Sequence, residues 1–307
     1  MNQAFFSIIL PTYNRAHFLP KAIESVLNQP FIDWELIIID DGSTDNTKNV
    51  VEQYSDKRIR YHWQENQERS IARNNGIKIA NGKYICFLDS DDYYLENHLS
   101  HFFEALQNHN FPVAFFYSNI LFEKLDGNIE KHVPNEEFTG DLAFILRTTI
   151  HSQQTCIHRD ILQKHLFNKL FKVGEDIELW MRIFDEYPVH HLTHHSIVVV
   201  QHNERTISRL NTDAYKSIIT LYHHIFAKPN PGNKIPYSYR QFLYSSVYFG
   251  IAKSCMLNRK KWLAIYYLSK AVCLKPFVKY VKYRINLIFK LLFVPNYCEV
   301  FIKENAE

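Results

Sequence analysis

The sequence has few of the residues that stabilise small secreted folds or build thiolate metal centres. Its five cysteines are scattered over 307 residues and include no Cys-x-x-Cys pair. Such an odd, scattered set argues against a disulfide framework and against a thiolate zinc site. The first residues lack the basic start of a signal peptide, and no uncharged apolar run reaches the roughly 18 residues that span a bilayer. These absences predict a non-spanning protein of the reducing cytoplasm.

Acidic residues are missing from one long segment near the C-terminus. Residues 214–298 contain 14 Lys and Arg and no Asp or Glu, whereas residues 1–213 contain 20 basic and 29 acidic residues. The overall net charge of +3 hides this asymmetry. Because the basic segment is rich in Tyr, Phe, Leu and Ile, it can bury apolar surface. The pattern predicts an N-terminal domain over residues 1–210 and a basic, aromatic-rich helical domain over residues 211–307, with an anionic partner.

The first third of the chain alternates short apolar runs with segments of helical periodicity. Continuously apolar strands that alternate with helices predict an α/β fold, in which a mainly parallel sheet is flanked by helices. In such sheets, ligands bind beyond the carboxyl ends of the strands. The predicted strands are residues 5–10, 34–39, 59–62 and 84–88, and the predicted helices are residues 16–28, 45–54 and 70–80.

Three of the predicted strands end in polar clusters, namely residues 12–15, Asp40-Asp41 and residues 89–91. The carboxylates of Asp89 and Asp91 repel each other unless a cation lies between them. A hard divalent ion, Mg²⁺ or Mn²⁺, held by Asp and by substrate phosphates is one solution. The alternative is a solvated turn in which Asp92 caps a helix. Asp40 either accepts hydrogen bonds from a nucleotide or belongs to an ordinary turn.

Four further residues carry groups that suit chemistry at this edge. Arg73, in the predicted helix 70–80, is placed either to pair with a phosphate or to form a surface ion pair. Glu175 and Asp176 either favour a helix N-terminus or supply a general base. His202 follows a predicted strand over residues 196–200 and is a candidate metal ligand or diphosphate contact. The paired histidines at 190–191 and 194–195 are predicted in a loop or at a strand edge.

Taken in order, five segments resemble the family 2 glycosyltransferases of the GT-A fold. They are SIILPTYNR, LIIIDDGSTDNT, ARNNGIKIANGKYICFLDSDD, GEDIELWMRI and HNERTIS, and the resemblance covers about two-thirds of the chain. In that family, the segment after the first strand and the acid that ends the second hold the nucleotide base. The arginine of ARN approaches the diphosphate, and the DxD pair binds ribose and a divalent metal.

The resemblance assigns roles residue by residue. It implies Asp176 as the catalytic base, with Glu175 as the second choice. The DxD pair corresponds to Asp89 and Asp91. The predicted metal ligands are Asp91, Asp89 and His202, and the predicted donor-binding residues are Pro11, Thr12, Tyr13, Arg15, Asp40, Arg73, Asp89 and Ser90.

The implied function is inverting transfer of a sugar from a nucleotide sugar, with a UDP-sugar as the expected donor. The implied acceptor is a glycan or a lipid-linked glycan of surface polysaccharide biosynthesis. Two alternatives stay open. One is a nucleotidyltransferase on a similar fold, although PTYNRAHF lacks the glycine that a phosphate loop after the first strand needs. The other is a catalytically inactive sugar-nucleotide-binding or scaffold protein.

Two regions of the sequence concern specificity. The family's acceptor site corresponds to residues 113–172, where His151, Gln153 and Gln154 are the candidates. The family often has a glycine in the pattern NxGxxxARN, whereas this chain reads Asn66-Gln67-Glu68-Arg69 at that place. A Glu-Arg pair is expected to close or reshape the donor pocket.

The basic C-terminal segment predicts three helices, over residues 244–257, 262–274 and 276–294. In the last one, four lysines and Asn286 are spaced so that they form one polar stripe, and the other faces are largely apolar. A basic amphipathic helix of this kind, through residues 275–294, binds anionic membrane; the alternative is a packed helix with its lysines in water. No nucleic-acid partner is expected, and the predicted location is the cytoplasmic face of the cell membrane. The stripe lysines are Lys275, Lys279, Lys282 and Lys290, and the side chains predicted to insert are Phe277, Ile288, Leu291 and Phe293.

Overall fold

The computed structural model describes residues 4–134, 138–204, 212–274 and 278–304. The chain forms two compact units, Met1–Arg205 and Thr206–Glu307. The domain boundary expected at residues 210 and 211 falls on residues outside the described ranges and stays a prediction.

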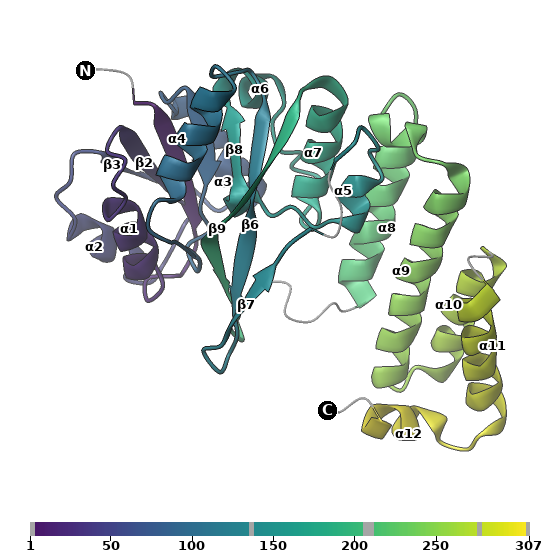
Figure 1. Cartoon of the computed structure of the whole chain (residues 1–307). Helices are drawn as coiled ribbons and strands as arrows, with labels where there is room; N and C mark the ends of the chain where they lie inside the picture. Colours follow the sequence, from purple (N-terminus) through teal and green to yellow (C-terminus); the bar gives the residue numbers. More distant parts are fainter. Residues whose placement is uncertain (1–3, 135–137, 205–211, 275–277, 305–307) are drawn as a thin grey trace. The chain divides into compact units, whose positions relative to one another are not determined.

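The N-terminal half of the first unit contains the predicted alternation of strands and helices (Figure 1). Four neighbouring strands, in the order β3-β2-β1-β4, are parallel. The helices that connect them pack against this part of the sheet. The strands are β1 (Phe6–Thr12), β2 (Trp34–Asp40), β3 (Ile59–Trp63) and β4 (Tyr84–Phe87), and the helices are α1 (Leu19–Leu27), α2 (Thr47–Glu52) and α3 (Arg69–Ile79).

The rest of the first unit extends the sheet with strands that are mostly antiparallel, so the whole sheet is mixed rather than mainly parallel. Its order continues β4-β8-β6-β9-β5, and β7 pairs with β6. Among the described residues of this half, only the pair β6–β9 is parallel. The four histidines at 190–191 and 194–195 lie inside β9. The elements are β5 (Tyr93–Tyr94), α4 (His98–Asn108), β6 (Phe115–Glu123), β7 (Ile129–His132), α5 (Phe144–Arg147), η1 (Ser152–Gln154), β8 (Thr155–His158), α6 (Arg159–Lys164), α7 (Glu175–Glu186) and β9 (Val189–Val200).

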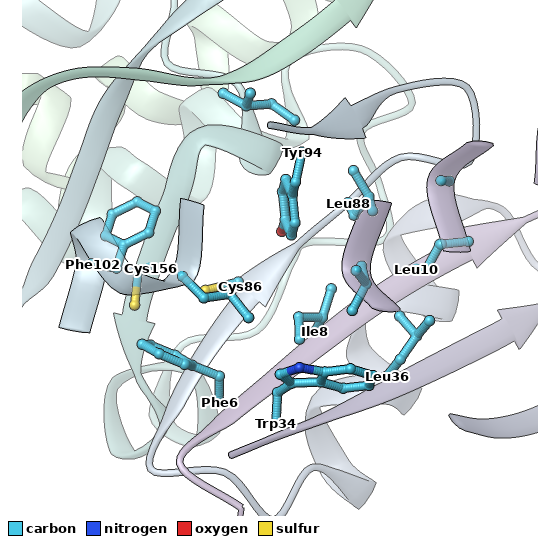
Figure 2. Packing of buried hydrophobic residues seen from close by; sticks show 14 of the residues in the cluster. Phe6, Ile8, Leu10, Trp34, Leu36, Cys86, Leu88, Tyr94, Phe102 and Cys156 are labelled. Atoms are coloured by element: carbon cyan, nitrogen blue, oxygen red, sulfur yellow. The ribbon is translucent and has the colours of Figure 1, made fainter. Parts of the chain in front are cut away.

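The core of this unit lies on the sheet, because β1, β2 and β4 are apolar along nearly their whole length. Figure 2 shows side chains from these strands packed together with Tyr94, Phe102 of α4 and Cys156 of β8. The first strand ends two residues later than the sequence predicted, because it continues through Pro11 to Thr12. As a result, Thr12 is the register partner of Asp40 at the carboxyl edge.

A glycine sets the distance between α3 and the sheet. A Cβ atom at Gly76 would lie 2.5 Å from Cγ2 of Ile9, which is closer than real side chains approach. Only glycine allows this close packing of the helix on β1. Because α3 follows β3, its N-terminal turn lies at the carboxyl edge of the parallel strands.

The second unit is helical, as the basic segment predicted (Figure 1). Its own apolar core includes Ile251, Cys255, Leu268 and Leu287. Within the described residues, none of the helices combines the length and the apolar character that crossing a bilayer requires. The helices are α8 (Thr212–Phe226), η2 (Pro231–Lys234), α9 (Tyr237–Leu257), α10 (Lys261–Cys273), α11 (Val278–Phe293) and α12 (Tyr297–Glu304).

The helix α11 exposes a different apolar face from the one expected. Leu291 is buried and Ile288 packs against the core, so neither is available to insert into a membrane. Phe293 is exposed as expected, and the neighbouring exposed apolar side chains are Ile285, Phe289 and Leu292. Lys282 is exposed. The expected contributions of Lys275, Phe277 and the Lys279 side chain fall outside the described part of the chain.

Several histidines of the first unit are held in the neutral form by their surroundings. Burial lowers the pKa of His98 to about 3, and the nearby His101 acts in the same direction. Burial also lowers the pKa of His101, with His194 as the second cause and Glu104 opposing. The rings of His101 on α4 and His194 on β9 stack with their centroids 4.0 Å apart. Burial lowers the pKa of the following histidines too: His62, His158, His165, His190 and His195.

These shifts predict that the first unit loses stability as the pH falls below about 6.5. Below this pH the histidines of the unfolded chain are protonated, whereas those of the folded protein stay neutral because their pKa is lower. The free energy of unfolding therefore drops with falling pH. The double variant His101→Gln/His194→Gln should show a shallower drop between pH 7.5 and 5.5, measured by urea unfolding at each pH. The control is His132→Gln, which replaces an exposed histidine of β7. An equal slope in the double variant and the wild type would contradict the prediction.

Candidate functional site

The carboxyl ends of β1 and β2 place an oriented carboxylate beside a free hydroxyl. Asp40 is buried, and it accepts hydrogen bonds from the Ser43 amide at 2.8 Å and from the Tyr61 hydroxyl at 2.5 Å. Burial and the Asp40 carboxylate raise the pKa of Tyr61, which keeps that hydroxyl a donor. Thr12 Oγ1 is buried and has no hydrogen-bond partner among the described residues. Thr12 therefore offers a spare hydrogen-bonding group next to Asp40.

The loop after β1 contacts the segment that follows β9. Arg15 forms an ion pair with Glu204, with Nη1 and Oε2 2.6 Å apart, so its guanidinium is already engaged. The rings of Phe18 and His202 lie 4.4 Å apart. Tyr13 is about half exposed, and Pro11 is partly buried. Arg15, a predicted donor-binding residue, is thus held against the segment that contains His202.

The acidic run after β4 brings three carboxylates together. Asp89, Asp91 and Asp92 each place an oxygen within 4.8 Å of the others. Asp92 is buried, and its oxygens accept hydrogen bonds from Gln153 Nε2 at 2.7 Å and from the Val200 amide at 2.9 Å. It is therefore no helix cap. Oxygen donors held this close fit a hard divalent cation, which relieves their repulsion. The sequence analysis missed Asp92, although the run Asp89-Ser90-Asp91-Asp92 contained the signal.

His202 lies against this acidic cluster. Its Nε2 is 2.8 Å from Asp91 Oδ2. Its Nδ1 is buried and has no partner within the described ranges. The structure thus places His202 beside Asp91 of the DxD pair, and its role as a metal ligand or diphosphate contact stays a prediction. Ser90, between the two carboxylates, is buried.

Arg73 connects the DxD pair with the Glu175-Asp176 pair. Its Nη2 donates to Asp89 Oδ1 at 2.7 Å, and its Nη1 donates to Glu175 Oε1 at 3.1 Å. Burial disfavours the charged guanidinium, but Asp89 and Glu175 outweigh it and raise the pKa of Arg73. Its Nε is buried without a partner in the described residues. A fixed cation with one spare donor suits a phosphate oxygen.

The two acids at the start of α7 have raised proton affinities. Gly174 precedes the helix with φ 75°, and Glu175 behind it is buried. Burial raises the pKa of Glu175, with Asp176 adding to the effect and the two arginines Arg69 and Arg73 opposing it. Burial also raises the pKa of Asp176, whose Oδ1 accepts a hydrogen bond from the Ile177 amide at 2.8 Å. A carboxylate with a raised pKa suits proton abstraction near neutral pH.

Arg69 is a second site residue that the sequence analysis did not assign. Its Nε lies 2.9 Å from Glu175 Oε1, and the same oxygen forms the ion pair with Arg73. The signal was its spacing from Arg73, because residues four apart share one face of a helix.

The acceptor candidates occupy different environments from one another. Gln153 and Gln154 are buried, and Gln154 Nε2 donates to the Ser118 carbonyl at 2.6 Å. Together with the Gln153–Asp92 bond, this makes both side chains part of the framework around the acidic cluster. His151 is partly exposed.

Comparison with known proteins places this arrangement in a family. The model of "Glycosyl transferase family 2" matches residues 7–166. The GalNAc(5)-diNAcBac-PP-undecaprenol beta-1,3-glucosyltransferase of Campylobacter jejuni is 34% identical over 59% of this chain and 60% of its own length. The UDP-Glc:alpha-D-GlcNAc-diphosphoundecaprenol beta-1,3-glucosyltransferase WfgD of Escherichia coli is 33% identical over 61% of this chain and 72% of its own length. An uncharacterised glycosyltransferase of Rickettsia bellii is 34% identical over 60% of this chain, which spans only 27% of that relative's length.

Solved structures agree in fold. TarS 1–349 of Staphylococcus aureus, in complex with UDP-GlcNAc, superposes with a TM-score of 0.65 at 20% identity, over 98% of this chain and 88% of TarS 1–349. The mannosyltransferase PcManGT of Pyrobaculum calidifontis, with GDP-Man and Mn²⁺, gives 0.57 at 15% identity, over 99% and 85%. These likenesses confirm the predicted GT-A fold with a helical C-terminal part. Since the family model matches more than half of the sequence, this chain belongs to glycosyl transferase family 2.

Proposed function

We propose that this protein transfers a sugar from a nucleotide-sugar donor to a glycan acceptor, with inversion at the anomeric carbon. The observation that carries the proposal is the bridge made by Arg73, which bonds to Asp89 and to Glu175 at 2.7 and 3.1 Å. This bridge brings a diphosphate-binding group next to a candidate base. A binding or scaffold protein has no need of Asp176 beside that cation.

The donor that fits best is a UDP-sugar. Thr12 Oγ1 and Asp40 offer a donor and an acceptor to the nucleotide at the edge of β1 and β2. With the nucleotide bound at Thr12 and Asp40, Arg73 and Asp89 would lie next to its diphosphate. The relative from Escherichia coli carries UDP-Glc in its name, which supports a uridine diphosphate donor.

A divalent cation, Mg²⁺ or Mn²⁺, fits between the donor and the acidic cluster. Asp89 and Asp91 would hold it, because their carboxylate oxygens converge, and His202 would be a further ligand through Nε2, which lies 2.8 Å from Asp91 Oδ2. When bound, such an ion supplies positive charge next to a diphosphate leaving group. Asp92 keeps its two hydrogen bonds and orients the cluster.

In the proposed reaction, Asp176 takes the proton from an acceptor hydroxyl. The acceptor oxygen attacks the anomeric carbon from the face opposite the nucleotide, and the bond between that carbon and the diphosphate oxygen breaks. Arg73 stabilises the negative charge that develops on the departing nucleoside diphosphate. Glu175 is bound by two arginines, so it is the second choice as base.

We further propose that the acceptor is linked to a lipid diphosphate, as part of surface polysaccharide biosynthesis. The names of the relatives from Campylobacter jejuni and Escherichia coli both specify undecaprenol-linked acceptors, which supports this class. Such an acceptor requires the enzyme to work at a membrane surface, here the cytoplasmic face of the cell membrane.

The helical unit offers a face for peripheral membrane binding. On α11, Phe289, Leu292 and Phe293 are exposed, and Lys282 is exposed on the same helix. On α10, Trp262 and Tyr266 are exposed. Aromatic and basic side chains on amphipathic helices bind the interface of anionic membranes. The absence of acidic residues from positions 214–298 favours the same partner.

The first test concerns the metal. Asp91→Ala should abolish metal-dependent binding of UDP, because the variant loses a central oxygen ligand. Titration calorimetry with UDP, with and without Mn²⁺, measures this directly. The control is Asp141→Ala, which removes a carboxylate paired with Arg147 outside the cluster. Unchanged Mn²⁺ dependence in Asp91→Ala would remove the metal assignment.

The second test concerns the base. Asp176→Asn should bind UDP-glucose as the wild type does and transfer glucose about 10²–10⁴-fold more slowly, because a general base acts only in the transition state. Transfer to a lipid-linked GlcNAc diphosphate gives the rate, and calorimetry gives the affinity. Wild-type activity should fall as the pH drops through the raised pKa of Asp176, since only the deprotonated carboxylate accepts a proton. Near-normal transfer by the variant would shift the role to Glu175.

The third test concerns the membrane. The variant Lys282→Gln/Lys290→Gln should bind vesicles that contain phosphatidylglycerol roughly 30-fold more weakly, because each lysine near an anionic surface contributes about 1 kcal/mol. The variant Phe289→Ser/Phe293→Ser should lose the binding that persists at high salt. Co-sedimentation with vesicles of phosphatidylcholine, with and without phosphatidylglycerol, measures both. Ile129→Ser, at an exposed position of β7, is the control. Equal binding by all variants would rule out α11 as the anchor.

A further inference from the structure

The loop that enters α3 has a backbone conformation that side chains rarely adopt. Glu68 has φ 73° and ψ 157°, a region that is essentially restricted to glycine. It stands at the glycine position of the pattern NxGxxxARN. Such conformations persist only when the surroundings hold the backbone in place.

The contacts of the Glu68 side chain do not account for this strain. Its carboxylate lies 2.5 Å from Lys172 Nζ, and more than half of each side chain is exposed to solvent. Exposed ion pairs of this kind contribute little stability. The backbone on either side is held more firmly: the Gln67 amide donates to Asp41 Oδ1 at 2.9 Å, and Arg69 makes the contacts described next.

Arg69, the first residue of α3, points into the site. Its Nε lies 2.9 Å from Glu175 Oε1, and its Nη2 donates to the backbone carbonyl of Lys172. Together with the Glu68–Lys172 pair, these contacts join the loop before α3 to the segment that leads into α7. These contacts hold Lys172 and Glu175, which flank Gly174 at the start of α7.

Glu175 needs this second cation because Arg73 is shared. Arg73 divides its guanidinium between Asp89 and Glu175, whereas Arg69 Nε has Glu175 as its one carboxylate partner in the described part of the chain. A buried carboxylate is costly unless it is well paired. Burial raises the pKa of Glu175, and Arg69 is the strongest influence in the opposite direction.

We propose that Arg69 is a positioning residue: it fixes Glu175, and with it the first turn of α7, so that Asp176 is held where it takes the acceptor proton. The inference rests on the proposed role of Asp176. The charged groups around Asp176 are Arg69 and Arg73 on α3 and Glu175 on its own helix. The two arginines lower the pKa of Asp176 against the effect of burial. Loss of the Arg69 charge should therefore raise the pKa of Asp176.

The first experiment needs no substrate. Hydrogen exchange of the peptide 172–180 should be faster in Arg69→Gln than in the wild type, while peptides of β1 and β2 stay unchanged. The control is Arg147→Gln, which removes an arginine paired with Asp141. Arg69→Lys keeps the charge but loses the fork that reaches both Glu175 and the Lys172 carbonyl, so it should also exchange faster. Unchanged exchange of residues 172–180 in both variants would overturn the proposal, whatever reaction the protein catalyses.

The second experiment separates positioning from a merely structural role. In Arg69→Gln, kcat for transfer from UDP-glucose should fall roughly 10- to 100-fold with little change in the KM for the donor, as expected of a misplaced reacting group. The acid limb of its pH–rate profile should move to higher pH. Arg69→Lys should restore the position of that limb, because it restores the charge. If wild type transfers sugar and both variants keep its kcat and its acid limb, the positioning role is wrong and the proposed function stands.

Discussion

The site depends on one constraint, which is that several carboxylates must share a small, largely dry space. Buried acids are tolerated only with cations or hydrogen-bond donors close by. Arg73 meets this requirement by bonding to Asp89 and Glu175 at once. Because a guanidinium is planar and its donors diverge in fixed directions, the bridge fixes the distance between two motifs that are far apart in the sequence.

The scaffold supports this bridge through the two halves of the sheet. In the parallel half, Gly76 allows α3 to pack closely on β1. The ends of β1 and β2 in the same half place Thr12 next to Asp40. The antiparallel half delivers the remaining parts: β8 follows the turn that holds Gln153, and the end of β9 leads into His202. The pairing of Thr12 with Asp40 thus comes from the parallel half of the sheet, and the surroundings of Asp92 come from the antiparallel half.

The helical unit divides its apolar residues between two tasks. Leu287 and Leu291 of α11 fill its core, while Phe289 and Phe293 face outwards. A helix has enough circumference for both, since residues two apart lie on different faces. Exposed aromatic side chains next to lysines are costly in water unless a partner covers them, and the charge of residues 214–298 favours an anionic one.

By itself, the sequence determined the elements whose signals are local. Apolar runs and helical periodicity located β1, β2 and α3 to within a few residues, and the DxD and Glu175-Asp176 motifs were legible because neighbouring residues define them. Only the tertiary structure decided which groups meet. Three features depend on segments that are distant in the sequence. They are the mixed strand order, the buried bond between Asp92 and Gln153, and the contact of Arg69 with Glu175. No periodicity records such pairings, because they depend on how strands and helices pack after each has formed.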